Sequence, residues 1–175
     1  DQANDDNQTP LMLAAWTGVV DVAALLIQHG AQVNTEENWT GQSALMWAGS
    51  RNHPAMAELL ITNGADVKVR ARSFDWSSQI TSEPRNQYRP AGGLTPLLYS
   101  VRSGCLQCVQ AIVEAGADFN LPTPEEVTPL MVAIDNFHFD TAHYLLDQGA
   151  NPHTFDWWGR TPLYIAIDVR TNEGR

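Results

Sequence analysis

Apolar residues recur along most of the chain at three- and four-residue spacing, in short runs separated by polar residues and glycines. In the segment 93–120 one run contains Leu97 and Val101, and a second run contains Val109 and Ile112. This spacing predicts amphipathic α-helices, each with one apolar stripe. Two helices of this length are too small to bury their stripes against each other alone. The segment therefore predicts a helical pair that needs neighbours of its own kind.

Residues with known preferences for helix ends bound these runs. Thr95 supplies an N-cap hydroxyl, and Pro96 follows at the first helical position, where a missing N–H is tolerated. Gly116 ends the second helix of the pair as its C′ residue. Asn7 and Phe137 stand where other segments have a turn glycine. We expect a positive φ at Asn7, and at Phe137 either a positive φ or a shifted turn.

The same two signals recur along the chain. Thr-Pro-Leu or a close variant begins at Thr9, Ser43, Thr95, Thr128 and Thr161, and Gly-Ala begins at Gly30, Gly64, Gly116 and Gly149. The Thr-Pro-Leu signals follow one another at spacings of 34, 52, 33 and 33 residues. A period near 33 that extends over nearly the whole chain indicates a stack of repeated units.

With Gly-x-Thr-Pro-Leu at the start of each unit and Gly-Ala-Asp near its end, the sequence resembles the ankyrin repeat family. The resemblance implies an all-α fold class, an ankyrin-repeat solenoid of stacked helix-turn-helix units with β-turn finger loops. We expect one domain over 1–175, with repeats at about 4–36, 38–68, 92–122, 123–155 and a partial repeat at 156–175. In the partial repeat we expect the helix to stop after Ile167, with no second helix in 168–175.

The spacing between the second and third units exceeds the period by 19 residues, which predicts an insertion at 69–91. The insertion has no helical period, and long loops within compact repeats are functional or disordered. Its aromatic residues favour order. We expect Phe74 or Trp76 to pack against a neighbouring repeat, and the arginines to be free to contact the acidic body or a partner.

The formal net charge of −10 favours solubility and argues against nucleic acid or an anionic membrane as the main partner. No run of apolar residues is long enough for a transmembrane helix. Half of the ten basic residues lie between Lys68 and Arg89, so the expected insertion is positive and the rest of the chain is strongly acidic. The compartment stays unknown.

The only two cysteines, Cys105 and Cys108, have CxxC spacing near a predicted helix start. Such a motif can lower a thiolate pKa and serve redox chemistry. The alternative is that Cys108 replaces a buried aliphatic residue, because cysteine is a good small hydrophobe. We favour the second interpretation, since the βαβ context of redox motifs is missing.

The resemblance also implies that partners bind the finger tips and the concave face. Tryptophan and arginine are the residue types enriched at binding hot spots. The predicted partner-binding residues are Trp16, Trp39, Arg51, Arg70, Arg72, Arg102, Trp157 and Arg160. For Trp39 and Trp158 we favour the alternative that each indole packs on the next finger or under the insertion and lengthens the core, whereas for Trp157 we favour binding.

Catalytic, metal and cofactor motifs are not found in the sequence. The five histidines are scattered, and no P-loop, nucleophile elbow or dinucleotide fingerprint occurs. We therefore expect no cofactor, no metal and no enzymatic activity. The predicted function is a non-catalytic protein–protein interaction module that binds its partner through the finger tips, the concave face and the insertion at 69–91. The alternatives are a regulatory or targeting segment of a larger enzyme whose catalytic domain lies outside this chain, and a structural spacer. The expected partners are another protein and, at both ends, further repeats of the parent chain.

Overall fold

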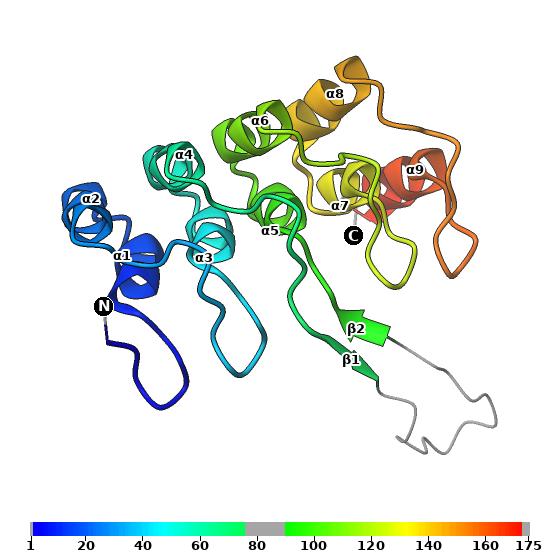
Figure 1. The fold of residues 1–175 in the computed structure, drawn as a ribbon. Helices are drawn as coiled ribbons and strands as arrows, with labels where there is room; N and C mark the ends of the chain where they lie inside the picture. The colour runs from blue at the N-terminus through cyan, green and yellow to red at the C-terminus, as the bar shows by residue number, and fades with distance from the viewer. Residues whose placement is uncertain (1, 76–89, 173–175) are drawn as a thin grey trace.

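The computed structural model describes residues 2–75 and 90–172. Its helices form two parallel rows, with loops that project from one row like fingers (Figure 1). The row beside the fingers contains α1 (Pro10–Thr17), α3 (Ala44–Ser50), α5 (Pro96–Ser103), α7 (Pro129–Asp135) and α9 (Pro162–Asn172). The other row contains α2 (Val20–Gln28), α4 (Pro54–Thr62), α6 (Leu106–Glu114) and α8 (Phe139–Asp147). Each helix contacts its neighbours in its own row, and each helix from α1 to α8 also contacts its partner in the pair, as a solenoid requires.

The helix starts predicted from Thr-Pro-Leu are confirmed. The hydroxyl oxygen of Thr95 accepts a hydrogen bond from the N–H of Leu98 (3.2 Å), and Thr9 and Thr128 cap α1 and α7 in the same way. The turn predictions also hold, because φ is 60° at Asn7 and 63° at Phe137. These caps and turns fix where each helix begins and therefore which side chains face the core.

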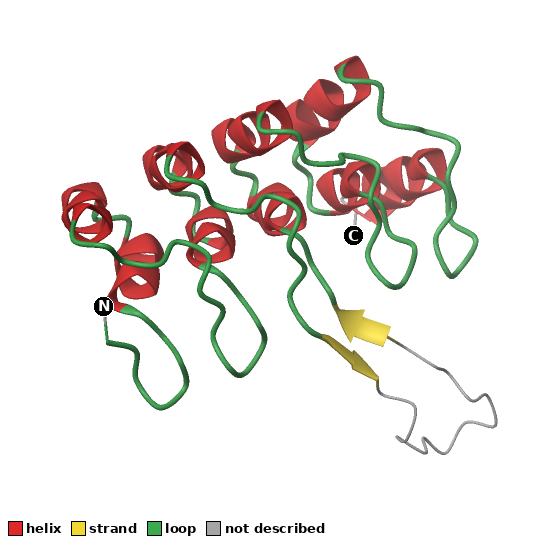
Figure 2. Ribbon diagram, viewed as in Figure 1, coloured by secondary structure: helices red, strands yellow, loops and turns green. Residues whose placement is uncertain are grey.

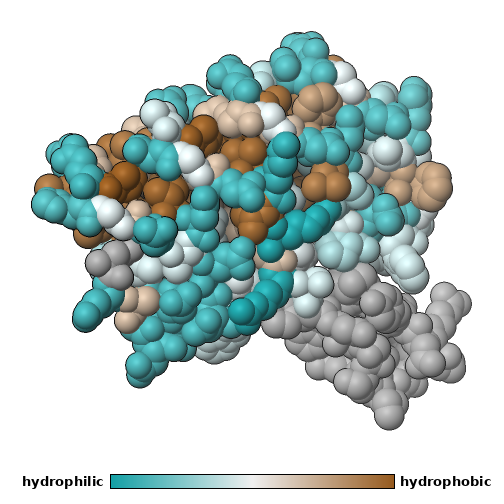
Figure 3. Space-filling view, viewed as in Figure 1, coloured by the Kyte–Doolittle hydropathy of each residue, from teal (hydrophilic) through white to brown (hydrophobic). Residues whose placement is uncertain are grey.

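The core is a column of equivalent residues that runs along the stack. The leucines of the Thr-Pro-Leu signals, Leu11, Leu45, Leu97 and Leu130, are at most 1% exposed. The equivalent Leu163 in α9 is 69% exposed. Figure 3 shows apolar surface gathered over the helices and mostly polar surface over the finger loops. Burial of the repeated leucines between neighbours is thus the main term that holds the stack together.

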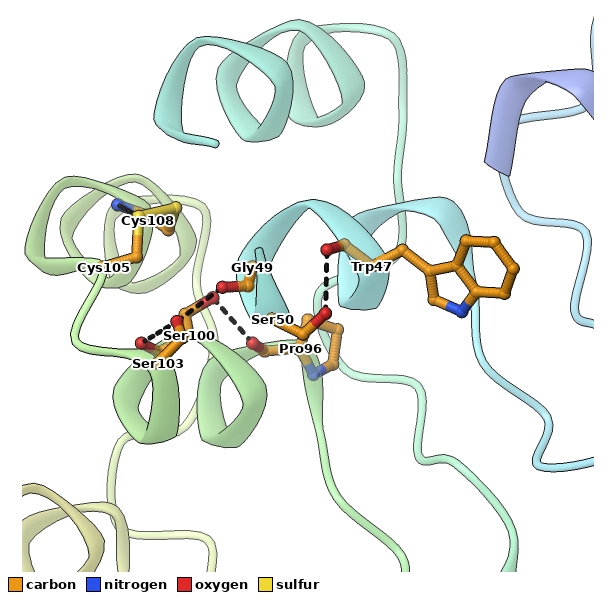
Figure 4. Close-up of a disulfide and its surroundings, with 8 residues drawn as sticks. All are labelled: Trp47, Gly49, Ser50, Pro96, Ser100, Ser103, Cys105 and Cys108. Atoms are coloured by element: carbon orange, nitrogen blue, oxygen red, sulfur yellow. Dashed lines mark hydrogen bonds between the residues drawn. A yellow bond between two sulfur atoms is a disulfide. The ribbon is translucent and has the colours of Figure 1, made fainter. Parts of the chain in front are cut away.

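Polar contacts to backbone carbonyls join neighbouring repeats. One ring nitrogen of His53 lies 3.2 Å from the carbonyl oxygen of Trp16, and His138 makes the equivalent contact with Arg102 (3.2 Å). In the third repeat Cys105 stands in the place of these histidines. There the Ser103 hydroxyl donates a hydrogen bond to the Gly49 carbonyl oxygen (2.6 Å) instead (Figure 4).

Cys105 and Cys108 are joined by a disulfide within the first turn of α6 (Figure 4). The expected burial is confirmed, since both residues are 0% exposed, but the expectation of a simple buried thiol is wrong. A residue at the N-cap and one three positions later lie close enough to be linked, with 5.2 Å between the two Cα atoms. Full burial is typical of structural rather than reactive sulfurs.

The C-terminal helix is longer than the sequence analysis expected. Helix α9 continues past Ile167 to Asn172. Val169 lies one turn after Ile165, and both are buried, so the apolar stripe extends into the segment that was expected to be irregular. The described part of the chain shows no second helix after α9.

The expected insertion begins and ends in a short antiparallel pair of strands, β1 (Ser73–Asp75) and β2 (Pro90–Gly92). This small sheet is the one departure from helix and loop in the described chain (Figure 2). The prediction that Trp76 packs against a repeat lies outside the described residues, and so does the same prediction for the Phe74 side chain.

Candidate protein-binding surface

Each regular finger is closed by one polar side chain that accepts backbone hydrogen bonds. In the first finger the Asn4 side-chain oxygen accepts from the N–H groups of Asp6 (3.1 Å) and Gln8 (2.8 Å). In the fourth finger the Thr123 hydroxyl accepts from Glu125 (3.3 Å) and Val127 (3.2 Å). The acceptors of the second and fifth fingers are Glu37 and Asp156, each 2% exposed. These internal bonds hold the finger tips in fixed positions.

Backbone hydrogen bonds also connect neighbouring fingers. The N–H of Asn38 donates to the carbonyl oxygen of Asp6 (2.8 Å), and the N–H of Trp157 donates to that of Glu125 (3.1 Å). Between the second and third fingers, the N–H of Arg72 donates to the carbonyl oxygen of Thr40 (2.7 Å). The fingers therefore stand side by side along the lower edge of the stack, next to the row that begins with α1 (Figure 1).

The first hollow of this surface lies between fingers one and two and the helices α1 and α3. Its volume is about 480 Å³. It is lined by Gln8, Leu13, Trp16, Glu37, Trp39, Thr40, Gln42 and Trp47. Within it Trp39 is 76% exposed and Trp16 is 43% exposed. The Trp16 ring meets Trp47 edge to face at 5.5 Å, and the Arg51 guanidinium lies 4.2 Å from the centre of the Trp16 ring.

Glu37 places a negative charge beneath this hollow. Burial raises the pKa of Glu37, but the hydrogen bonds that its carboxylate accepts from the N–H of Gln42, the hydroxyl and N–H of Thr40 and the N–H of Trp39 outweigh burial. Its pKa therefore lies below the ordinary value for a glutamate. The side chain both fixes the second finger and stays ionised at neutral pH.

The second hollow lies on the same side of the stack, among α5, α7 and the fingers near them, and has a volume of about 290 Å³. Its lining includes charged side chains of both signs, namely Arg102, Glu125, Asp135 and Arg160. The Arg160 guanidinium lies 5.0 Å from the centre of the Trp158 ring, and its Nε donates to the Asp156 carboxylate (2.8 Å). This hollow is thus more polar than the first.

The structure groups most of the predicted binding residues around these two hollows. Trp16 and Trp39 line the first, with Arg51 against Trp16, and Arg102 and Arg160 line the second. Trp157 is 58% exposed at the fifth finger tip and lines neither hollow. Trp39 is 76% exposed, so the packing alternative that we favoured for it is wrong. Trp158 is 47% exposed, and for this residue the packing alternative stays a prediction.

Arg70 and Arg72 are placed between fingers rather than at a hollow. The Arg70 guanidinium donates to the carbonyl oxygens of Gly93 (2.7 Å) and Pro122 (2.8 Å), and that of Arg72 donates to the carbonyl oxygen of Asn38. Their donors thus bridge the second, third and fourth fingers. A role for the two arginines in partner binding stays a prediction.

The sequence analysis missed the residues that shape the first hollow from below. Leu13 is 53% exposed on α1, and Trp47 of α3 is partly buried against the core. It also missed the finger acceptors, although a signal for them exists. Asn4, Thr123 and Asp156 each precede the Thr of Thr-Pro-Leu by five residues.

Two rows of stacked helices with a fingered edge define a repeat solenoid whose loops present a binding surface. The family described as "Ankyrin repeats (3 copies)" matches residues 1–71, 78–156 and 97–173. The chain therefore belongs to the ankyrin repeat family.

Relatives share this region within longer proteins. The chain is 29% identical to the mouse (Mus musculus) B-cell lymphoma 3 protein homolog, in an alignment that covers 95% of this chain and 34% of that protein. It is 33% identical to mouse ankyrin repeat and SOCS box protein 6, over 71% of this chain and 26% of that protein. An L-asparaginase of Dirofilaria immitis is 26% identical over 87% of this chain and 28% of the enzyme. The chain thus spans about a third or less of the curated relatives it matches.

Residues 2–75 and 90–172 show neither of two other kinds of feature, a metal site or a membrane-spanning helix. They contain no cluster of three or more histidine, cysteine or acidic side chains placed to hold a metal ion. They also contain no helix with the length and apolar character needed to cross a membrane.

Proposed function

We propose that this chain binds another protein through its finger tips and concave face, without catalysis of its own. Ankyrin repeats are protein–protein interaction modules, and the surface described above has the required shape. The observation that carries the proposal is the exposure of indole rings at finger tips, 76% for Trp39 and 58% for Trp157. An exposed large apolar side chain forfeits about 1.5–3 kcal/mol that a covering partner restores.

The composition of the surface supports the same conclusion. Tryptophans line the first hollow, with Arg51 against Trp16, and tryptophan and arginine both line the second. These residue types dominate the energetics of protein interfaces. The hydrogen bonds within and between the fingers hold the surface in place before a partner arrives. A fixed surface loses little conformational entropy on binding, which favours affinity.

A second candidate function is a regulatory or targeting segment of a larger enzyme. The observation that favours it is the similarity to an L-asparaginase, an enzyme in which the matched region makes up 28% of the length. In that case the finger surface contacts a catalytic domain that lies outside this chain. The two candidates share the binding surface and differ only in whether the partner belongs to the same polypeptide.

The proposal is tested by affinity capture with three forms of the protein, followed by quantitative mass spectrometry. The test variant is Trp39→Ala with Trp157→Ala. The matched control is Gln28→Ala with Gln107→Ala, because both glutamines are exposed on the helix row away from the fingers. Loss of two hot-spot residues is expected to reduce specific capture by tenfold or more, while the control retains it.

Circular dichroism first checks that all three forms are folded. If all three then capture the partner equally, the proposal is wrong. A captured enzyme domain encoded by the same gene favours the second candidate.

A further inference from the structure

In the fifth finger a buried carboxylate is paired with a cation of the same chain, the guanidinium of Arg160. The carboxylate, that of Asp156, accepts hydrogen bonds from the N–H groups of Trp158 (3.0 Å) and Arg160 (2.8 Å). The Nε of Arg160 donates a further hydrogen bond to the same carboxylate (2.8 Å). The guanidinium carbon of Arg160 lies 5.0 Å from the centre of the Trp158 ring. A carboxylate, an indole and a guanidinium thus form one unit, in which the arginine neutralises the buried charge.

The second finger repeats this arrangement without the arginine. The Glu37 carboxylate accepts hydrogen bonds from the N–H groups of Trp39 (2.6 Å) and Gln42 (2.9 Å). These bonds establish the correspondence between the two fingers: Glu37 with Asp156, Trp39 with Trp158, and Gln42 with Arg160. The second finger has one more residue than the fifth, and the longer glutamate side chain spans it. A carboxylate and an indole are present, and a neutral amide stands in the place of the guanidinium.

The negative charge of Glu37 is consequently unpaired within the described part of the chain. Glu37 is 2% exposed, and none of the ion pairs of residues 2–75 and 90–172 includes it. Arg51 and Arg72, which lie on neighbouring segments, make other contacts, because Arg51 lies over Trp16 and Arg72 donates to a backbone carbonyl. Because little water screens a buried carboxylate, a guanidinium that faces it in good geometry interacts with it more strongly than in bulk water.

We propose that the hollow between fingers one and two receives an arginine side chain of a partner protein. Its guanidinium lies over Trp39 and faces Glu37, as Arg160 does within the fifth finger. The apolar stem of the arginine packs against Leu13 and Trp16 in the hollow of about 480 Å³. A planar guanidinium stacks on an indole better than an ammonium does, which favours arginine over lysine. This inference rests on the proposed function and names the chemistry that the partner presents.

The probe for the test is N-acetyl-arginine amide, compared with the citrulline, lysine and leucine analogues. The readout is the indole N–H resonance of Trp39 in ¹⁵N NMR spectra, assigned with Trp39→Phe. The arginine probe is expected to shift this resonance saturably, and the citrulline probe, which has the same shape without charge, to bind about tenfold more weakly. Equal binding of the citrulline probe, or tighter binding of the lysine or leucine probe, overturns the proposal.

The variant Gln42→Arg supplies the missing cation from within the chain and copies the fifth finger. It is expected to abolish the titration by the arginine probe. The matched control Gln42→Leu removes the same amide without adding a charge and is expected to keep the titration. If Gln42→Arg binds the arginine probe as the wild type does, the correspondence between the two fingers does not extend to their chemistry and the proposal fails.

The outcomes separate this inference from the proposed function. If Trp39→Ala with Trp157→Ala loses partner capture while the arginine probe leaves the Trp39 resonance unmoved, the surface binds a protein through other chemistry. The inference is then wrong and the proposed function stands.

Discussion

The contact between α3 and α5 allows a sharp test of how closely the repeats are stacked. A Cβ atom built on Gly49 falls well inside van der Waals contact of the Ser100 hydroxyl oxygen, and 3.4 Å from the Ser100 Cβ. Ser100 is 0% exposed, and its hydroxyl donates to the Pro96 carbonyl oxygen (2.9 Å), so turning the hydroxyl away from an added methyl group breaks a buried hydrogen bond. A glycine is therefore needed at position 49 because α3 and α5 approach each other closely there, and not because the backbone turns.

We expect Gly49→Ala to destabilise the protein because two opposed effects are unequal. Alanine is favoured over glycine inside a helix by about 1 kcal/mol. Overpacking a closed interface costs about 1–3 kcal/mol. The net destabilisation is then about 0–2 kcal/mol. In a Ser100→Ala background the clashing oxygen is gone and the remaining Cβ lies at an ordinary contact distance of 3.4 Å, so the same change becomes neutral or stabilising.

The assay is a double-mutant cycle of Gly49→Ala and Ser100→Ala measured by urea unfolding. The expected coupling energy is about 1–3 kcal/mol in favour of the double variant, since the two residues share one steric contact. Additive effects within about 0.5 kcal/mol would show that the stack relaxes around the added methyl group, and would refute the reasoning.

Two further predictions concern the second repeat. Ala44→Pro should stabilise the protein by about 0.4–1 kcal/mol, because the equivalent position holds proline in the other repeats and the Ala44 N–H donates no backbone hydrogen bond within the described chain. Ala48→Pro, in the middle of α3, is the control and should destabilise by about 3 kcal/mol or more in the same urea assay. Glu37→Gln should destabilise at pH 7 but much less in acid. The lowered pKa of Glu37 means that its stabilisation is present above the unfolded value of about 4.3 and is lost as the pH falls through the folded value. The measurement is the difference in urea midpoint between the wild type and Glu37→Gln. If this difference is as large at pH 3 as at pH 7, this account of Glu37 is wrong.

The fold follows from the sequence because each repeat carries its own local signals. Thr95 with Pro96 and the stripe from Leu97 to Val101 fix one helix without reference to distant residues. Since a solenoid brings together only neighbouring units, the period then gives the tertiary arrangement as well. The extension of α9 escaped prediction because its last turn depends on Val169 alone, a weak signal in a polar segment.

The candidate surface was only partly predictable for a different reason. Position within a repeat identifies which residues lie at finger tips, such as Trp39 and Arg160, and which lie at the ends of the helices beside the fingers, such as Trp16 and Arg102. What these side chains contact depends on the register between fingers, and the extra residue in the second finger shifts that register. For Trp39 and Trp158 the sequence therefore could not separate burial from exposure, and for Cys105 and Cys108 it could not establish a bond that depends on local helix geometry.

The structure separates the residues that stabilise the stack from those that select a partner. Leu45 and Leu97 are 1% exposed, and their helices α3 and α5 each contact the helices on both sides, so a change at either leucine weakens the packing of the stack. The finger positions equivalent to Trp39 hold Asp6, Glu125 and Trp158, residues of opposite character, on the same hydrogen-bonded loop. Because the loop is held through backbone N–H groups, the side chain at this position is not needed for folding. Changes at Trp39 should therefore alter stability by no more than about 0.5 kcal/mol while they change binding. Partner chemistry can then vary from finger to finger without loss of the fold, and the missing arginine of the second finger is one such variation.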